Sequence, residues 1–229
     1  MSQLLTRTAP TLQPLDTESL ASRIADRIVD AVAAGTLAPG QRLVEAEIAA
    51  ALGVSRMPLR EALKLLEAQG ILSVTPRRGS FVVPFDEGRI GQICDARLAL
   101  ERLALRRAVP AFRADPGLLA ELDGLIGTMR QEAERRAWLA ANKADLAFHR
   151  RIVAAAGDGI VAMLWEALAR HVLIVFGREI RDERDVHLLE DPHVRLRELL
   201  ATGDVGALDD EIERHIMRLR PVANGLGEP

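Results

Sequence analysis

The chain has 229 residues, of which 48% are hydrophobic, and its formal net charge is −3. That length fits one large domain or two small ones, and the balanced charge excludes a chain that is basic throughout, so any surface for nucleic acid has to be local. The single cysteine, Cys94, excludes an internal disulfide, and the absence of tyrosine argues against stacking platforms for single-stranded nucleic acid.

The N-terminal quarter predicts an arm followed by two helices. Residues 1–16 are polar, contain two prolines and show no period, so we expect a flexible arm. Residues 18–34 place apolar side chains four positions apart, which indicates an amphipathic helix that ends at Gly35. Residues 45–52 predict a short helix, and Gly53 follows it where a left-handed conformation is needed.

A further helix and a hairpin follow. Ser55 is a good N-cap residue for a helix over 55–69, and Pro58 falls in its first turn, where a missing N–H does no harm. Because Pro58 has no amide hydrogen, we expect Ser55 to cap the amide of Met57. Residues 71–83 change to short β-type runs around a Pro-Arg-Arg-Gly turn, which predicts a two-stranded hairpin with two arginines at its tip.

This order of elements is that of a winged helix-turn-helix, whose second helix enters the DNA major groove with its N-terminal residues leading. Arg56, Arg60 and Lys64 lie four positions apart and share one helical face, opposite an apolar face that packs on the preceding helices. Arginine suits guanine O6 and N7, and lysine suits phosphate. A merely solvated helix face is the alternative. The predicted DNA-contacting residues are Ser55, Arg56, Met57, Pro58, Arg60 and Lys64 on the helix, and Arg77, Arg78 and Gly79 on the wing.

Three motifs in this region, G-T-L-A-P-G-Q-R-L, G-V-S-R-M-P and L-R-E-A-L, resemble the DNA-binding domain of the GntR family of bacterial transcription regulators. The resemblance covers about residues 18–83 and implies operator contacts from Arg56, Arg60 and Arg78. Ala46 stands where some members carry an arginine that contacts DNA, so we expect that contact to be absent. Met57 replaces a common threonine, which leaves the base preference at that point open.

From residue 86 onward the sequence is helical, and six segments with short connections predict an antiparallel bundle. We therefore expect a mainly α protein with an arm (1–16), a winged helix-turn-helix domain (17–84) and a helical domain (85–229). Breaks are expected at Pro110, Pro116, Gly157, the acidic run that ends at Pro192, and Gly203. The predicted helices are 86–110, 115–136, 138–156, 159–183, 188–202 and 204–220.

The bundle contains four side chains that suit a metal ion. Asp145 and His149 are one turn apart on one helix, and His193 and His215 follow on two later helices. Three imidazoles and a carboxylate suit Zn²⁺ and, after it, Ni²⁺, Mn²⁺ or Fe²⁺. By spacing alone, such residues are more often a surface Asp–His pair and structural histidines than a metal site.

The bundle also resembles the FCD branch of the same family over residues 88–220, through R-L-A-L-E at 97–101, D-L-A-F-H at 145–149 and the two late histidines. The resemblance implies that Asp145, His149, His193 and His215 hold a divalent metal. His171 and His187 match nothing in that pattern, so we expect them to be structural or exposed. Asp158 stands where the family often has asparagine, and we expect it to cap a helix.

Arg97 is the predicted anchor for a small carboxylate effector, which would fill the open coordination positions of the metal. An i, i+4 ion pair with Glu101 is the alternative for this arginine. Trp165 is expected to fill the core.

These observations predict a ligand-responsive bacterial transcription regulator rather than an enzyme. A homodimer would bind a palindromic operator through two winged helices, and a small organic acid in the bundle would change its DNA affinity. A metal-dependent hydrolase is one alternative, although HExxH, GxSxG and GxxxxGK are absent from the sequence. An architectural DNA binder without an effector is another.

The chain shows no stretch close to the roughly 18 apolar residues of a membrane helix and opens without a secretory signal, so we expect a soluble cytoplasmic protein with no membrane partner. The sequence leaves open the effector, the operator and its genes, repression or activation, the native metal, and the geometry of the dimer.

Overall fold

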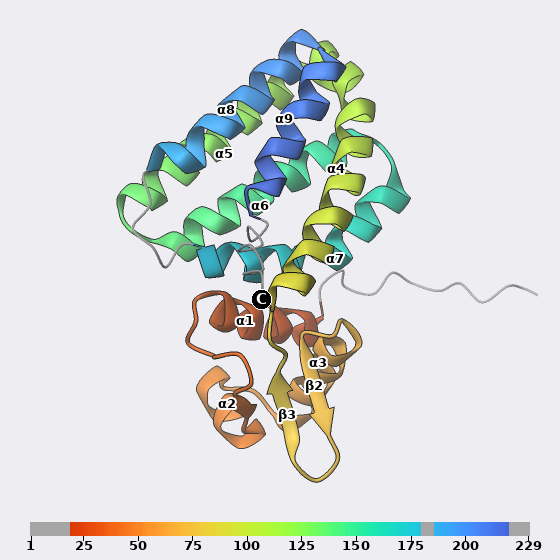
Figure 1. The fold of residues 1–229 in the computed structure, drawn as a ribbon. Helices are drawn as coiled ribbons and strands as arrows, with labels where there is room; N and C mark the ends of the chain where they lie inside the picture. Colours follow the sequence, from red (N-terminus) through yellow and green to blue (C-terminus); the bar gives the residue numbers. More distant parts are fainter. Residues whose placement is uncertain (1–18, 180–185, 220–229) are drawn as a thin grey trace, which may run out of the picture.

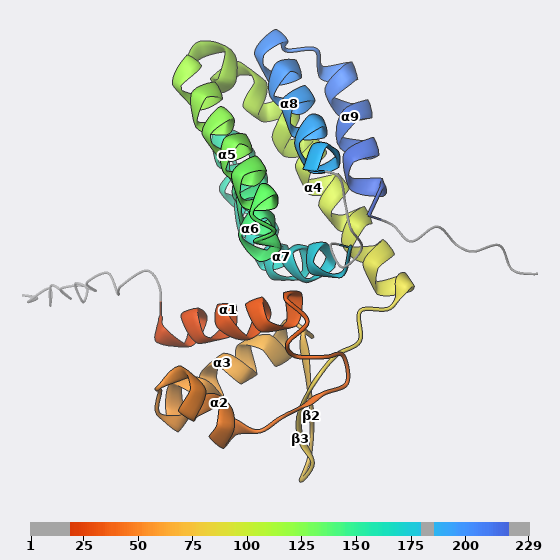
Figure 2. The same cartoon turned by 90° about the vertical axis from the view of Figure 1, so that its left-hand side faces the viewer.

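The structure is a computed structural model, and it describes residues 19–179 and 186–219. A small head built from the N-terminal third lies below a bundle of long helices (Figure 1). Figure 2 shows that α7 (Gly159–Glu179) runs across the top of α1 (Leu20–Ala33), where the two parts meet. The predicted fold class, a winged helix-turn-helix followed by an all-α bundle, is confirmed.

The head consists of three helices and a small antiparallel sheet. After α1 come α2 (Glu45–Leu52) and α3 (Arg56–Ala68), and the strands are β1 (Arg42–Leu43), β2 (Leu72–Thr75) and β3 (Gly79–Val82) in the order β1-β3-β2. Thr75 pairs with Gly79 at the hairpin tip, and Arg42 of β1 pairs with Phe81. We did not predict β1, because two residues are too short to show an alternating pattern.

The core of the head forms between α1 and α3. Ile24, Ile28 and Val32 of α1 are buried, as are Leu59 and Leu66 of α3. The polar face of α3 is thereby turned outward, and it carries the predicted cations.

The helix boundaries around α3 follow the sequence, except for one cap. Gly53 has φ 64°, the left-handed conformation that we expected. Ser55 is the N-cap residue of α3, but among the described residues its side chain accepts no capping hydrogen bond, so the predicted cap on Met57 is wrong. N-cap side chains bond to the second or third amide of a helix; Pro58 removes the third, and the second, that of Met57, is present but receives no bond from Ser55.

The bundle contains six helices within residues 87–179 and 186–217, as predicted. They are α4 (Glu87–Ala114), α5 (Pro116–Glu134), α6 (Trp138–Ala155), α7, α8 (Val186–Thr202) and α9 (Val205–Met217). Two predicted breaks are wrong, because α4 continues through Pro110 and α8 continues through Pro192. A proline removes one helical hydrogen bond, and here buried neighbours such as Val109 and Leu196 hold both helices in place.

Helix α7 corrects the expectation that no segment of the chain approaches the length and apolar composition of a membrane helix. Its residues Gly159–Gly177 have a mean hydropathy of 1.7 and are long and apolar enough to cross a membrane by length and composition. Val161, Trp165, Val172 and Leu173 of this helix are buried in the protein core, and α7 contacts α1, α4 and α6. The apolar character of α7 is therefore explained by its burial between the head and the bundle.

Candidate functional site

The predicted cationic face of α3 is exposed along its whole length. Arg56, Arg60 and Lys64 all lie on the surface. Arg60 donates from Nε to Glu45 Oε2 at 2.9 Å, and the two side chains are 59% and 40% exposed. Exposed ion pairs contribute only about 0–1 kcal/mol, so this pair orients Arg60 without preventing it from exchanging Glu45 for a phosphate.

The start of α3 presents the other predicted residues. Ser55 is exposed, Met57 is 67% exposed and Pro58 is half-buried, whereas the next residue, Leu59, is fully buried. An exposed methionine at the leading end of a helix offers an apolar contact for a base edge. Ala46 is exposed on α2, where it offers no charge.

The wing carries its two arginines at the exposed tip of the hairpin. Arg78 donates its amide to Thr75 O at 3.0 Å, with Pro76 and Arg77 between them. Arg77 has φ 65°, a left-handed conformation that this turn position usually gives to glycine. Gly79 has φ 100°, and a Cβ there would lie 3.3 Å from Arg42 Nε. Arg42 is a cation beside the wing that sequence reasoning missed, although it belongs to the G-Q-R-L motif.

The structure brings all four predicted metal ligands together in the bundle. Asp145 and His149 come from α6, His193 from α8 and His215 from α9, and all four are buried. Each offers one ligand atom within 4.8 Å of the others. His149 Nε2 lies 3.0 Å from His215 Nε2 and 3.4 Å from Asp145 Oδ1.

The cluster fits a divalent ion chemically. Within the described part of the chain, Asp145 Oδ1 and His215 Nδ1 have no hydrogen-bond partner. Leaving a buried carboxylate oxygen without a partner is costly, and a cation would remove that cost. Ligand atoms about 2.1 Å from a central ion lie within about 4.2 Å of one another. The four ligand atoms, which lie within 4.8 Å of one another, would therefore have to move together only slightly to bind an ion.

The charges of the cluster also suit metal binding. Burial raises the pKa of Asp145, but His193 and His149 outweigh it and hold that pKa well below its ordinary value. Burial, together with the charges of His193 and His149, holds the pKa of His215 well below its ordinary value. Asp145 is therefore ionised and His215 is neutral, which are the forms that bind metal.

Glu101 of α4 connects this cluster to Arg97. Its Oε2 lies 2.6 Å from His149 Nδ1, and its Oε1 accepts from Arg97 Nε at 2.7 Å and from Trp165 Nε1 at 3.0 Å. Burial raises the pKa of Glu101, but Arg97 and His149 outweigh it and lower that pKa to about 2. For His149, burial lowers the pKa, but Glu101 and Asp145 together outweigh burial, so the pKa is raised.

The two readings of Arg97 are compatible. The ion pair with Glu101 is present and only 1% exposed on the arginine side. Arg97 Nη1 and Nη2 are nevertheless buried without a hydrogen-bond partner among the described residues, and Cζ lies 5.0 Å from the ring centroid of Phe176. The role of Glu101 toward His149 was not predicted, because 48 positions separate the two residues and no periodic pattern joins them.

The remaining predicted residues occupy structural places. Asp158 caps α7 by accepting from the amides of Ile160 and Val161 at 3.0 and 3.1 Å. Trp165 is fully buried, as expected. His171 is half-buried with Nε2 3.0 Å from Gln69 O, and burial lowers its pKa. His187 falls outside the side chains that the structure describes.

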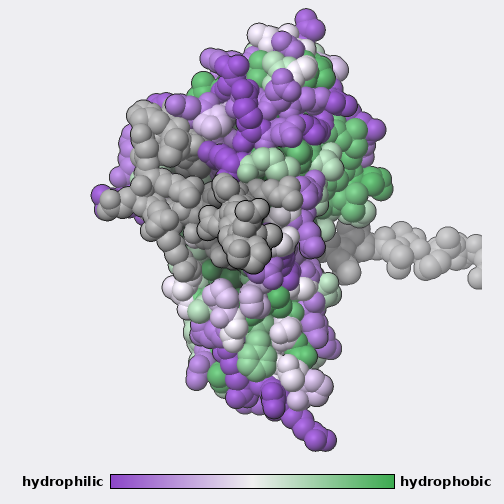
Figure 3. Space-filling model, viewed as in Figure 1, coloured by the Kyte–Doolittle hydropathy of each residue, from purple (hydrophilic) through white to green (hydrophobic). Residues whose placement is uncertain are grey.

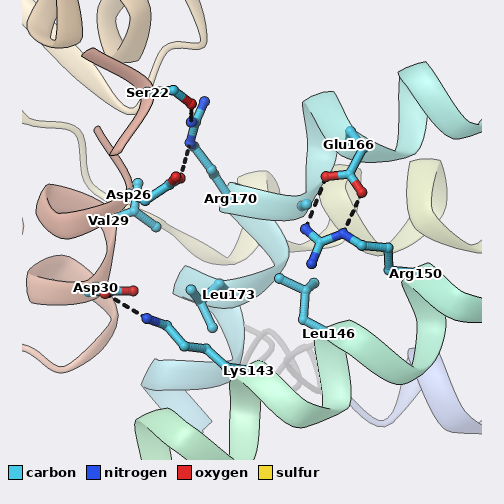
Figure 4. Close-up of a pocket in the computed structure, with 11 residues that line it drawn as sticks. Ser22, Asp26, Val29, Asp30, Lys143, Leu146, Arg150, Glu166, Arg170 and Leu173 are labelled. Carbon is cyan, nitrogen blue, oxygen red and sulfur yellow. Dashed lines mark hydrogen bonds and ion pairs between the residues drawn. The ribbon is translucent and has the colours of Figure 1, made fainter. Parts of the chain in front are cut away.

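The junction between head and bundle is held by polar contacts from α6 and α7. Arg170 donates to Asp26 Oδ1 at 2.8 Å, to Ser22 Oγ at 3.0 Å and to Oε1 of Gln69, the C-cap residue of α3, at 3.3 Å. Lys143, two positions before Asp145, donates to Asp30 Oδ2 at 2.6 Å (Figure 4). The junction therefore links the end of α3 to α7, and it links α1 to α7 and to α6, the helix that carries Asp145 and His149.

A cavity of about 610 Å³ lies at this junction, between α1, α6 and α7 (Figure 4). None of the described residues that line it belongs to the metal cluster, and its charged side chains pair with one another. The cavity is thus distinct from the predicted effector site.

Comparisons with known proteins agree with this architecture. Residues 20–82 match the family described as bacterial regulatory proteins, gntR family, and residues 92–218 match the FCD domain. A probable D-xylose utilization operon transcriptional repressor of Paenarthrobacter nicotinovorans is 30% identical over 92% of each chain. An uncharacterized HTH-type transcriptional regulator of Streptomyces ambofaciens is 38% identical over 58% of this chain, and the chain spans only 53% of that protein.

Solved structures show the same fold. Escherichia coli McbR/YncC superposes with a TM-score of 0.75 and 24% identity, over 89% of this chain and 98% of the other. A putative transcriptional regulator GntR from Rhodococcus sp. RHA1 superposes with a TM-score of 0.72 and 24% identity, over 87% of this chain and 95% of that one.

Proposed function

The chain belongs to the gntR family of bacterial regulatory proteins, with an FCD domain, and we propose that it is a ligand-responsive homodimer that binds a palindromic operator. The family and the relatives are regulators of transcription and not enzymes. The proposal adds the parts of the mechanism: a metal in the bundle, a small carboxylate effector, and a change in DNA affinity when that effector binds. We propose domains over 17–84 and 85–229 and a cytoplasmic location. The predicted arm, 1–16, lies outside the residues that the structure describes.

DNA recognition is proposed to fall on α3 and the wing. The exposed line of Arg56, Arg60 and Lys64 offers charge-assisted hydrogen bonds to guanine edges and phosphates. Arg77 and Arg78 at the exposed hairpin tip suit the backbone or the neighbouring minor groove. The net charge of the whole chain is slightly negative, so the proposal that it binds DNA is supported by this local group of exposed cations and not by the overall charge.

The metal site is proposed to consist of Asp145, His149, His193 and His215. A bound ion, Zn²⁺ first and Ni²⁺, Mn²⁺ or Fe²⁺ as alternatives, would supply a Lewis-acidic centre for a carboxylate oxygen. Asp145 contributes the negative charge, and the three histidines contribute neutral nitrogen donors from three helices. Holding α6, α8 and α9 at one point would make the packing of the bundle depend on the occupant of the site.

Arg97 is proposed to bind the other part of the effector. Its Nη1 and Nη2 are buried and lack a hydrogen-bond partner in the described part of the protein, and a carboxylate can accept from both at once. This pair of donors, next to a buried metal-type cluster, is the observation that carries the effector proposal. Because Arg97 and the cluster are buried, a ligand reaches them only in a more open bundle, so ligand binding selects a different conformational state.

The junction provides the route from the bundle to the head. Any movement of α6 or α7 displaces Lys143, Arg170 or His171, which bind Asp30, Asp26 and the last turn of α3. A population shift in the bundle would therefore change the placement of the DNA-binding helix.

The dimer is proposed to form through the start of α7. Ile160, Met163 and Leu164 are 65%, 60% and 48% exposed on neighbouring positions of the helix. Figure 3 shows hydrophobic surface on the right-hand side of the bundle, where α7 begins in Figure 1. A second copy is the occupant that fits, because a palindromic operator needs two heads related by a two-fold axis.

One experiment tests the proposal as a whole. The protein is screened against small carboxylates by thermal shift, with and without a chelator, and each ligand found is added to a fluorescence anisotropy assay on operator DNA selected in vitro. We expect a carboxylate that raises the melting temperature only in the metal-loaded protein and that changes DNA affinity. Specific DNA binding that neither chelation nor any carboxylate alters would support the architectural alternative.

A further inference from the structure

We infer that Glu101 is a positioning residue for the metal site, which fixes the His149 ring with Nε2 toward the cluster and links this ligand to Arg97. The inference rests on the metal site proposed above, and it adds a fifth residue that the family resemblance did not assign to it.

The carboxylate of Glu101 has three partners, one on each of three helices. Oε1 accepts from Arg97 of α4 and Trp165 of α7, and Oε2 faces His149 of α6 at 2.6 Å. Arg97, Glu101, His149 and Trp165 are all buried. A buried carboxylate with three well-placed donors cannot rotate without losing hydrogen bonds, so its position is fixed by its partners.

This contact determines which nitrogen of His149 is available. A neutral imidazole carries one proton, and a carboxylate beside Nδ1 keeps the proton there. The lone pair is then on Nε2, which is the atom that lies 3.4 Å from Asp145 Oδ1 and 3.0 Å from His215 Nε2. A carboxylate in this place both fixes the tautomer and makes the ligand nitrogen more basic.

The same carboxylate holds Arg97. Glu101 Oε1 accepts a hydrogen bond from Arg97 Nε, and the i, i+4 spacing keeps both side chains on one face of α4. The arginine is thereby oriented with Nη1 and Nη2 available, and it packs over Phe176. Two hydrogen bonds, Arg97–Glu101 and Glu101–His149, therefore connect the proposed effector anchor with a proposed metal ligand.

A purely structural role for Glu101, as the counter-charge of a buried arginine, predicts something different. In that case a neutral isostere would lower stability but leave the His149 tautomer and the metal affinity unchanged. Metal affinity and tautomer are thus the measurements that distinguish the two roles.

The test is Glu101→Gln. Glutamine has the same shape but only one accepting oxygen, so it cannot accept from Arg97 and His149 through separate oxygens. We expect Zn²⁺ affinity, measured by competition with a chromophoric chelator, to fall about 10–100-fold. We also expect ¹⁵N NMR of the metal-free protein, recorded at a pH at which the His149 ring is neutral, to show His149 moving from the Nδ1–H form toward the Nε2–H form.

Two controls accompany this variant. Glu213→Gln changes an exposed glutamate on α9 that pairs with Arg102, and should bind Zn²⁺ as the parent does. Trp165→Phe removes one donor to Glu101 but keeps the contact with His149, and should lower Zn²⁺ affinity by less than Glu101→Gln. If Glu101→Gln does not fold, Glu101→Asp, which keeps the charge but withdraws the oxygens, takes its place with a decrease in affinity expected.

Unchanged Zn²⁺ affinity and an unchanged tautomer in the folded variant would overturn the inference. That outcome differs from failure of the proposed function, in which the parent protein itself would bind no Zn²⁺ and the variants could not be ranked.

Discussion

The head and the bundle use charged side chains in opposite surroundings. On the head, Arg56, Arg60 and Lys64 lie in solvent, and the described ion pair among them, Arg60–Glu45, is itself exposed. In the bundle, Arg97, Glu101 and the four cluster residues are buried and contact one another at hydrogen-bond distances. The same residue types therefore have different energetic roles in the two regions.

The difference has a physical consequence. Exposed charges are screened by salt, cost little to rearrange and can exchange one partner for another, which suits a surface that binds and releases a phosphate backbone. Buried charges are stable only when their partners are complete, so they respond strongly to the loss or gain of one ligand. The head is suited to reversible contact, and the bundle is suited to sensing.

The largest expected effect is the loss of a buried ligand. His193→Ala should lower Zn²⁺ affinity by more than 100-fold, because it removes one of four donors from a buried site. Metal analysis of the purified variant after dialysis checks this, with His171→Ala as a matched control outside the cluster. Stoichiometric metal in the His193 variant would show that the cluster is not the metal site.

The pH dependence of the free energy of unfolding tests how strongly a buried carboxylate, that of Glu101, stabilises the bundle. The pKa of Glu101 is about 2 in the folded protein against an ordinary value of 4.5, so ionised Glu101 stabilises the fold above pH 4.5. That contribution, on the order of 3 kcal/mol at about 1.4 kcal/mol per pKa unit, is lost as the pH falls from 4.5 toward 2. Urea unfolding of metal-free protein at pH 5 and pH 3 should show a smaller decrease for Glu101→Gln than for the parent. Equal decreases would contradict the depressed pKa.

A substitution at the junction tests whether the two regions are packed as one unit. A Cβ at Gly177 of α7 would lie 2.0 Å from Ala33 O of α1, so Gly177→Ala should destabilise the protein by about 1–3 kcal/mol through overpacking. Gly124→Ala on α5 is the control, because nothing lies within 4 Å of the added Cβ, and it should be neutral or stabilising. Thermal unfolding of both variants provides the measurement, and equal melting temperatures would argue against a close contact at the junction.

A surface substitution should have a smaller and salt-dependent effect. Arg56→Ala should weaken operator binding by about 1–3 kcal/mol and relax base preference at one position if the side chain reaches a guanine. Anisotropy titrations at several salt concentrations check it, with Arg113→Ala, an exposed arginine at the end of α4, as the control. If the Arg56 variant binds the operator as tightly as the parent protein, the assignment of α3 to the DNA interface is wrong.

Local patterns predicted the elements, and the family resemblance supplied the four cluster residues, but neither predicted the contacts between distant segments. Four-residue apolar spacing located α1 and α3, and the spacing of Asp145 and His149 placed both on one face of α6. By contrast, Glu101 meets His149 and Arg170 meets Asp26 only after the helices have packed. Such pairs depend on tertiary structure, which no window of sequence contains.

Most of the errors have the same origin. Pro110 and Pro192 are helix breakers by local preference, and the burial of neighbouring residues overrides that preference. The capping hydrogen bond expected at Ser55 is absent from the described residues although the Met57 amide is present, and nothing in the structure explains this difference. Strand β1 forms only because β3 lies beside it.

The left-handed conformation of Arg77 sets the stability of the wing against the DNA contact proposed for this residue. A non-glycine residue in this conformation costs about 1 kcal/mol, so the turn would be more stable with glycine at that position. Arg77→Gly should therefore raise the melting temperature slightly while weakening the complex with DNA, so that one substitution moves the two properties in opposite directions. Selection that acted on stability alone would remove this arginine, whereas selection for operator binding would keep it.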